Sequence, residues 1–234
     1  MEPEEYVLMD RVEARMWWYR ALHSRLLHAA GGDPGPLLDL GCGTGGFLSL
    51  VPRSAAAFGL EWNGTAAAIA AAKSGHPVAR GSINQLPFAA GSIGTAIAAD
   101  VLCHEAVDPP AALAEIRRVL RPGGRLIVNM PAYRALMSVH DLRVHNARRM
   151  TATETGTMLE AAGFRVARIG YWNGLLLPLM ILQRKLLSRS SSRSDVAAFP
   201  PWLDRILHGM TELERHLPFP LPMGGSVLAI AERP

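Results

Sequence analysis

Cysteine, membrane-length apolar runs and an export signal are all missing or scarce in this sequence of 234 residues. Cys42 and Cys103 are the only cysteines, and both lie in or beside apolar runs, which predicts free thiols rather than a disulfide framework. The most apolar stretch, residues 175–182, is far shorter than the ~20 residues that cross a bilayer. The first residues are acidic and lack the apolar segment of a secretory signal. We therefore expect a cytoplasmic protein with no stable membrane insertion.

Charge and metal ligands also give little indication of partners. Charged residues make up 19% of the chain and the formal net charge is +4, an excess too small to indicate a nucleic-acid partner. No cluster of His, Cys and Asp has metal-ligand spacing, so we predict no metal site. The length and the 49% of hydrophobic residues suit one large domain, which we expect to be a monomer or a homodimer.

Short apolar segments alternate with helical patterns along the chain. A helix is expected at residues 5–30, and a Gly/Pro-rich segment follows it. Strands are expected at residues 37–40, 55–60, 78–80, 95–101, 125–130, 164–171 and 226–232. Helices are expected to begin at residue 47 and to span 65–73, 110–120 and 151–162, the last with Thr151 and Glu154 as a capping box. This alternation predicts an α/β fold with a doubly wound, mostly parallel, seven-stranded sheet.

About fifty residues separate the sixth and seventh expected strands. They contain an apolar helical pattern at 175–187, a Ser/Arg-rich linker at 188–195 and a helical pattern at 202–217. An insertion of this length in a compact domain is typically functional, so we predict that residues 175–224 form a helical lid. The rest divides into an N-terminal helical cap, residues 1–34, and a core formed by residues 35–174 and 225–234.

The most informative motif is the turn Asp-Leu-Gly-Cys-Gly-Thr-Gly-Gly, which begins at Asp39. Gly41, Gly43 and Gly45 allow a tight turn after a strand and let a ligand approach the backbone closely. Free N–H groups at the start of the next helix would face the same ligand. Gly41, Gly43 and Gly46 also satisfy the dinucleotide fingerprint G-x-G-x-x-G, so the turn alone does not separate NAD from S-adenosylmethionine (SAM).

In its setting, this turn resembles the first motif of the class I SAM-dependent methyltransferases. Segments 59–61, 81–88, 100–104 and 116–127 are similar to later motifs of that family, and the resemblance covers residues 35–170. It implies that SAM is the cofactor and S-adenosylhomocysteine the product. The residues implied in cofactor binding are Arg20, Asp39, Gly41, Cys42, Gly43, Thr44, Gly45, Glu61, Trp62, Ser82, Ile83, Asp100 and Val101.

The resemblance assigns several of these residues a part of SAM. Glu61 would accept hydrogen bonds from both ribose hydroxyls, and Trp62 would lie against the adenine. Ser82 replaces the Asp that the family often uses for the adenine amino group, which leaves the Ile83 backbone for that contact. Arg20 would pair with the methionine carboxylate, or with a surface acid instead.

The flanking segments resemble a narrower bacterial group that acts in natural-product, sugar or lipid pathways. Its signatures are a Trp-Trp-Tyr-Arg box, here residues 17–20, and a His-Asp segment followed by His-x-Arg-Arg-Tyr-Thr. In this chain Asn146 stands at the second His and Met150 at the Tyr, so any role of those two positions is not carried over. The resemblance implies a small-molecule or peptide acceptor.

Candidate acceptor and catalytic residues lie around the carboxyl ends of the strands, where ligands bind in such folds. His104 and His140 are the candidate general bases, each with a structural role as its alternative. His23 and His28 are expected to be ordinary residues on the surface of a helix. The candidates for acceptor binding are Tyr19, Arg148, Arg149, Tyr171 and Asn173. The two arginines favour an anionic acceptor, such as a carboxylate.

These observations predict a SAM-dependent methyltransferase, first of all an O-methyltransferase, with nitrogen and carbon acceptors left open. Two alternatives remain open: a non-catalytic SAM-binding or regulatory subunit, and an NAD(P)-dependent reductase. A nucleic-acid methyltransferase is disfavoured because no Asn-Pro-Pro-Tyr or Asp-Pro-Pro-Tyr box follows the fourth expected strand.

Overall fold

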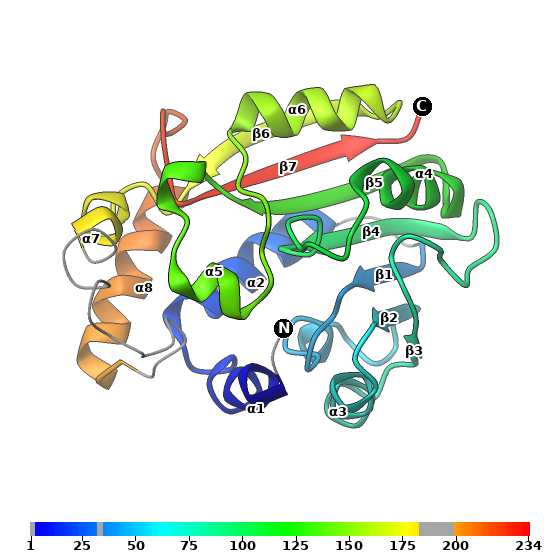
Figure 1. Cartoon of the computed structure of the whole chain (residues 1–234), viewed down its shortest axis with the longest axis horizontal. Helices are drawn as coiled ribbons and strands as arrows, with labels where there is room; N and C mark the ends of the chain where they lie inside the picture. The colour runs from blue at the N-terminus through cyan, green and yellow to red at the C-terminus, as the bar shows by residue number, and fades with distance from the viewer. Residues whose placement is uncertain (1–2, 32–34, 183–198) are drawn as a thin grey trace.

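The computed structural model describes residues 3–31, 35–182 and 199–234, and it confirms the predicted sheet (Figure 1). Seven strands form one sheet in the order β3-β2-β1-β4-β5-β7-β6. They are β1 (Leu37–Leu40), β2 (Ala57–Glu61), β3 (Val78–Arg80), β4 (Ile93–Ala99), β5 (Leu120–Pro131), β6 (Arg165–Trp172) and β7 (Ser226–Glu232). β1 to β5 pair in parallel, whereas β7 runs antiparallel between β5 and β6. The strand order reverses between β1 and β4, which is where doubly wound sheets bind ligands.

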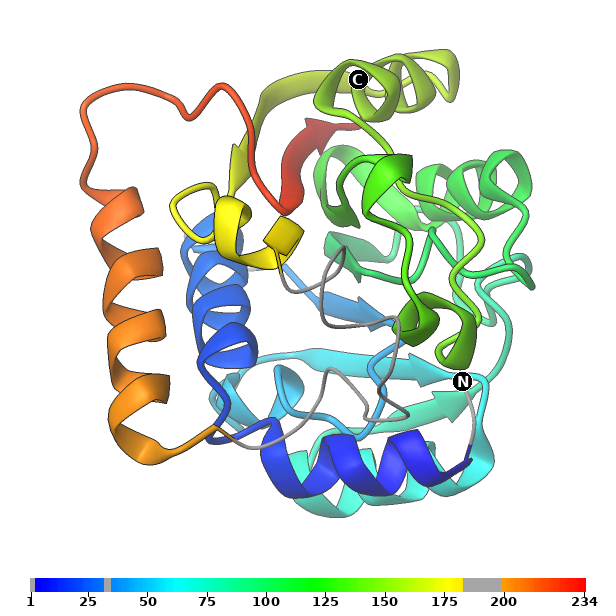
Figure 2. The same ribbon diagram turned by 60° about the vertical axis from the view of Figure 1, so that its left-hand side comes forward.

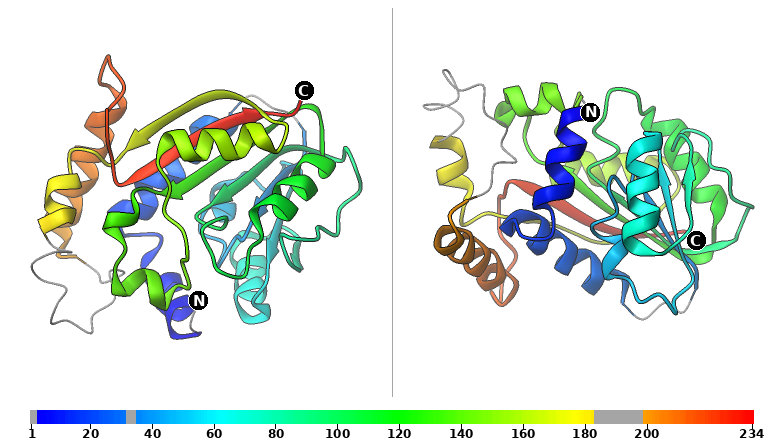
Figure 3. Two further views of the ribbon diagram at one scale, coloured as in Figure 1. Left: turned by 45° about the horizontal axis from the view of Figure 1, so that its top comes forward. Right: turned by 90° about the horizontal axis from the view of Figure 1, so that it is seen from below.

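Helices cover both faces of this sheet (Figures 1 and 3). The described helices are α1 (Pro3–Val12), α2 (Trp17–Ala30), α3 (Gly64–Ser74), α4 (Pro109–Val119), α5 (Val139–Arg143), α6 (Ala152–Ala161), α7 (Leu177–Leu182) and α8 (Pro201–Arg215). Two 3-10 turns, η1 (Leu48–Leu50) and η2 (Arg134–Leu136), complete them. The capping box predicted at α6 is present, with the Glu154 carboxylate accepting the Thr151 N–H at 2.7 Å.

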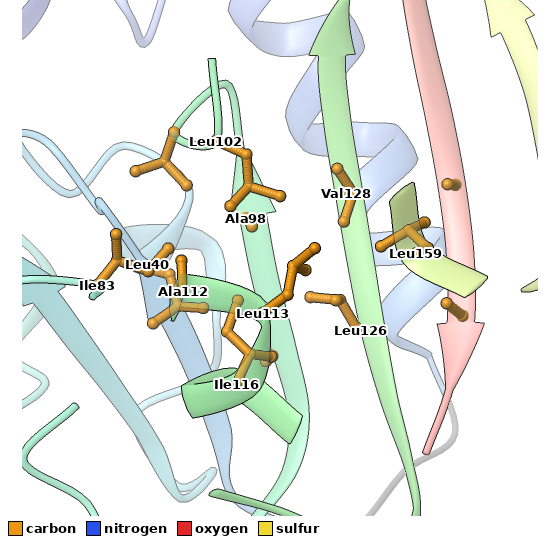
Figure 4. Close-up of a cluster of buried hydrophobic side chains, with 14 of the residues drawn as sticks. Leu40, Ile83, Ala98, Leu102, Ala112, Leu113, Ile116, Leu126, Val128 and Leu159 are labelled. Atoms are coloured by element: carbon orange, nitrogen blue, oxygen red, sulfur yellow. The ribbon is translucent and has the colours of Figure 1, made fainter. Parts of the chain in front are cut away.

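The core has two layers because the side chains of each strand alternate between the two faces. Ile97 of β4 and Ile127 of β5 pack on one face with α2 and with Leu48 of η1. Their neighbours Ala98 and Leu126 pack on the opposite face against α4, whose Leu113 lies against them in Figure 4. Strands buried on both faces are continuous in hydrophobicity, which is why short apolar runs identified them in the sequence.

Two predicted helices differ from the structure. The helix expected at residues 5–30 is divided into α1 and α2, because Glu13 is buried against Thr44 and Met16 has an extended backbone. The helix expected from residue 47 is only the three-residue turn η1. α1 consequently lies beside α3 rather than continuing α2 (Figure 2), and the Asp10–Lys73 ion pair of 2.5 Å joins them.

The insertion before β7 contributes to the layer on the α2 face. α8 packs alongside α2, where the Arg25 guanidinium donates to the Thr211 carbonyl and Glu214 accepts the Asn173 N–H at 2.7 Å. The Ser/Arg-rich linker predicted at 188–195 lies outside the described residues. Within the described ranges, no helix is long and apolar enough to span a membrane.

Candidate active site

A cavity of about 1030 Å³ opens at the carboxyl ends of β1, β2 and β4. Walls from α1, α2 and the 140–149 segment close it, together with Met180 of α7 and Phe199. Fifteen of the residues predicted for cofactor, acceptor or catalysis line it: Tyr19, Asp39, Gly41, Cys42, Gly43, Glu61, Trp62, Ser82, Ile83, Asp100, Val101, His104, His140, Arg149 and Asn173. The sheet thus brings together segments that are far apart in the sequence.

The glycine turn requires glycine for space as well as for backbone conformation. Gly43 has φ +55°, and a Cβ there would lie 2.7 Å from the Met9 Cε of α1. Gly45 has φ +84° and faces α3, where a Cβ would lie 2.7 Å from the Ala70 Cα. Gly43 therefore lets Met9 of α1 pack closely on the turn at the cavity, whereas Gly45 lets the turn pack closely on α3.

Glu61 ends β2 with its carboxylate held by neutral donors. Its Oε2 accepts the Gly43 N–H at 3.0 Å, and its Oε1 accepts the Asn63 N–H at 2.9 Å and the Tyr6 hydroxyl at 3.1 Å. The side chain is buried at the cavity wall. A carboxylate has about four acceptor sites and three are filled, so one site stays open on Oε2, and binding both hydroxyls of a diol requires one of the present donors to leave.

Two more acids line the cavity at the ends of β1 and β4. Burial, together with the smaller effect of the nearby Glu61 and Glu13 carboxylates, raises the pKa of Asp39 to about 7. Burial also raises the pKa of Asp100 to about 7, against the opposing effect of the Asn129 amide. Asp100 has φ +53°, a strained conformation for a residue with a Cβ.

The histidines divide by burial. His104, just after β4, is half-buried, and burial lowers the pKa of its imidazole, so the ring is neutral near pH 7. His140 of α5 is half-buried at the same cavity. The prediction for His23 is wrong: it is buried in the cavity wall, and burial lowers its pKa to about 4. His28 is exposed, as expected.

Five predicted site residues do not line the cavity. Arg20 forms an ion pair with Asp204 of α8, so α8 takes the guanidinium expected to hold the methionine carboxylate. Thr44 is wholly buried and donates to Glu13 at 2.9 Å, and Gly45 faces α3. The Tyr171 hydroxyl accepts the Ala152 N–H at 3.0 Å.

The two arginines expected to bind an anionic acceptor are both engaged inside the protein. Arg148 is the last of the five predicted residues that do not line the cavity. Its Nη1 donates to the His104 carbonyl at 2.6 Å. Arg149 lines the cavity but is buried, and its Nε and Nη2 donate to the two Asp141 carboxylate oxygens at 3.0 Å each. Its Nη1 donates to the Ala132 carbonyl at 3.2 Å. The pair fixes the 140–149 segment against the end of β5.

Several cavity residues were missed from the sequence. Tyr6 and Met9 reach the cavity only because α1 folds back over the turn, which no local pattern predicts. Gly46 was part of the motif but was omitted from the predicted site, and it does line the cavity. Met180 and Phe199 come from the insertion, whose length was the one signal available.

Comparisons with known proteins agree with this geometry. Residues 38–128 match the family model described as a methyltransferase domain. A probable S-adenosylmethionine-dependent methyltransferase of Mycolicibacterium smegmatis is 29% identical over 82% of this chain and 76% of its own length. An uncharacterized 37.1 kDa protein in transposon TN4556 of Streptomyces fradiae is 30% identical over 88% of this chain and 68% of its own length.

The chain belongs to the class I SAM-dependent methyltransferases. SAM is the methyl donor, which resolves the ambiguity of the glycine turn against NAD. A solved structure with the same fold is the geranyl diphosphate C-methyltransferase of Streptomyces coelicolor in complex with Mg²⁺, geranyl diphosphate and S-adenosylhomocysteine. It has a TM-score of 0.62 and 17% identity, and the match covers 92% of this chain and 78% of that one.

The residues of this methyltransferase fit SAM. Gly43 presents a backbone without a side chain to the cavity, and Glu61 offers a buried carboxylate beside it. The acids of the cavity suit the positive charge of a sulfonium.

Proposed function

We propose that this methyltransferase transfers the methyl group of SAM to a hydroxyl oxygen of a small-molecule or peptide natural product. The observation that carries the proposal is the neutral, half-buried His104 in the same cavity as Gly43 and Glu61. A hydroxyl must lose its proton when it attacks, and a neutral imidazole near pH 7 can accept it.

SAM supplies an electrophilic methyl group, and the protein's main tasks are alignment and exclusion of water. In the proposed assignment, Glu61 binds the ribose hydroxyls, while Trp62, Ser82 and the Ile83 backbone contact the adenine. Cys42, Gly41 and Val101 shape the wall beside the donor, and Asp39 and Asp100 attract its positive charge.

On the acceptor side, a ring nitrogen of His104 takes the hydroxyl proton, with His140 as the second candidate. Tyr19 and Asn173 contact the acceptor. We further propose that residues 175–224 act as a lid, because Met180 and Phe199 line the cavity. Location in the cytoplasm and a monomeric or homodimeric state stay predictions from the sequence.

A carboxylate acceptor was the form of O-methylation that the Arg148–Arg149 pair favoured. That support is removed, because both guanidinium groups are bonded within the protein. A hydroxyl acceptor therefore fits the cavity better than a carboxylate.

The test uses SAM with an isotopically labelled methyl group, a panel of hydroxylated acceptors, and mass spectrometry. We expect transfer by the wild-type protein and a loss of about 10²-fold or more in kcat for His104→Gln, with SAM affinity retained. SAM binding without transfer to any acceptor would instead favour a non-catalytic, regulatory subunit.

A further inference from the structure

The described lining of the cavity is strongly unbalanced in charge. It contains seven carboxylates, Glu5, Glu13, Asp39, Glu61, Asp100, Glu105 and Asp141, and one guanidinium, Arg149. His23 and His104 do not restore the balance, because burial lowers the pKa of both imidazoles and keeps them neutral near pH 7. Arg149 neutralises Asp141 and Lys73 neutralises Glu13, which leaves five carboxylates. The cavity therefore has a negative electrostatic potential, which grows as Asp39 and Asp100 ionise near pH 7.

The single guanidinium of the lining is not available to a ligand. Arg149 and Asp141 are both buried, and their two parallel hydrogen bonds of 3.0 Å make a neutral pair. An anion that displaced Asp141 would leave a wholly buried carboxylate without its cation, which is strongly unfavourable.

Three cations outside the lining are also engaged by other groups of the protein. Lys73 pairs with Glu13 and Asp10, and Arg20 pairs with Asp204. Arg25 is buried between α8 and Trp172, with its Cζ 4.6 Å from the centre of the indole ring. Glu61 and Asp100, by contrast, are held by neutral donors from Gly43 and Asn129. These three cations are thus bound to other groups of the protein, whereas the Glu61 and Asp100 carboxylates line the cavity without a cationic partner in these hydrogen bonds.

A second part of the described lining is an apolar and aromatic wall. Trp17, Trp18 and Tyr19 line it from α2, and Met180 and Phe199 line it from the insertion. Trp18 stacks on Trp172 with ring centroids 6.1 Å apart, which fixes this wall on the sheet. Such a surface binds an apolar or aromatic body.

On the basis of the proposed function, we infer that the acceptor has an apolar or aromatic body and no negative charge, and that the cavity rejects carboxylates and phosphates. The one positive charge of bound SAM offsets a single carboxylate, so an anionic acceptor still meets net repulsion. A neutral hydroxylated aromatic compound, or one with an amine, fits both the acidic and the aromatic parts of the lining.

The test compares aromatic fragments in matched triplets that share one ring and carry an ammonium, a carboxamide or a carboxylate. Their dissociation constants are measured by ligand-observed NMR on protein loaded with S-adenosylhomocysteine. Only triplets whose binding is weakened by Met180→Ala are scored, because Met180 lines the cavity and this restricts the comparison to fragments bound there. We expect the carboxylate of each triplet to bind about tenfold more weakly than the carboxamide, with the gap narrowing as salt is raised.

A matched pair of variants isolates the charge of the cavity. Glu105 is exposed at the cavity, whereas Glu160 is exposed on α6 and does not line it. Glu105→Gln should reduce the difference in dissociation constant between the carboxylate and the carboxamide of a triplet. Glu160→Gln should leave that difference unchanged. Carboxylates that bind as tightly as carboxamides, or a screen in which no triplet is scored, would overturn the inference. A separate titration with SAM distinguishes failure of this inference about acceptor charge from failure of the proposed function. In the second case the protein would not bind SAM.

Discussion

The Asn129 amide joins Trp172 to Asp100 across the interior of the sheet. Its Nδ2 donates to the Asp100 Oδ1 at 2.9 Å, and its Oδ1 accepts the Trp172 indole N–H at 2.8 Å. Because the indole can only donate, it fixes which end of the amide faces Asp100. A buried ring on β6 therefore orients an acid at the donor site.

Asn129→Asp should weaken SAM binding by about tenfold, because a second carboxylate next to Asp100 raises the pKa of the pair and favours its protonated form. Trp172→Phe keeps a ring beneath Arg25 and removes only the N–H, so it should cost about 1–3 kcal/mol of stability and a smaller part of SAM affinity. Calorimetry and urea unfolding measure the two effects. Unchanged SAM affinity in Asn129→Asp would show that Asp100 has no part in donor binding.

Arg149→Ala should destabilise the fold by about 3–5 kcal/mol, because it leaves the wholly buried Asp141 without its cation. Arg148→Ala removes a single hydrogen bond to the His104 carbonyl and should cost about 1 kcal/mol. Urea unfolding of the two neighbouring variants gives a direct comparison. Equal, small losses would contradict a structural role for Arg149.

SAM affinity should rise as the pH passes through about 7, because only ionised Asp39 and Asp100 attract a cation and burial has raised both pKa values to about 7. Binding then lowers these pKa values and releases protons, which calorimetry in buffers of different ionisation enthalpy detects.

The same shifts give stability the opposite sign in the free protein. An acid whose pKa is higher folded than unfolded contributes stability at low pH that is lost as the pH rises toward 7. Asp100→Asn should weaken the pH dependence of both SAM affinity and the free energy of unfolding. A SAM affinity that falls with rising pH would contradict this account.

Gly43→Ala should weaken SAM binding, because it places a Cβ at positive φ on the cavity lining, 2.7 Å from the Met9 Cε, so that the end of the Met9 side chain must move within the cavity. Gly91→Ala is the matched control, since Gly91 also has positive φ but a Cβ there meets nothing within 4 Å. The control should cost only about 1–2 kcal/mol of backbone strain and leave SAM affinity intact. Equal effects of the two substitutions on SAM affinity would show that the contact with α1 is irrelevant.

The features that the sequence predicted well have local or periodic causes. The apolar runs at β1 and β7 and the Thr151–Glu154 capping box were placed within a residue or two, because burial and capping leave direct signatures in sequence. The glycine turn and Glu61 were located for the same reason, and the parallel sheet brings them together.

The features that were mispredicted depend on distant contacts. Arg20, Arg148 and Arg149 were expected to bind ligands, but their partners Asp204, the His104 carbonyl and Asp141 are set by how loops and the insertion pack. The break after α1 depends on Thr44, thirty-one residues beyond Glu13. A local pattern contains no information about such partners.

The most direct test of the central claim is calorimetry of SAM with the wild-type protein, Glu61→Gln and the control Glu160→Gln. We predict that the wild-type and control proteins bind SAM equally, that Glu61→Gln binds about tenfold more weakly, and that NADH does not bind. No SAM binding by the wild-type protein, or unchanged binding by Glu61→Gln, would contradict the assignment of this cavity as the methyl-donor site.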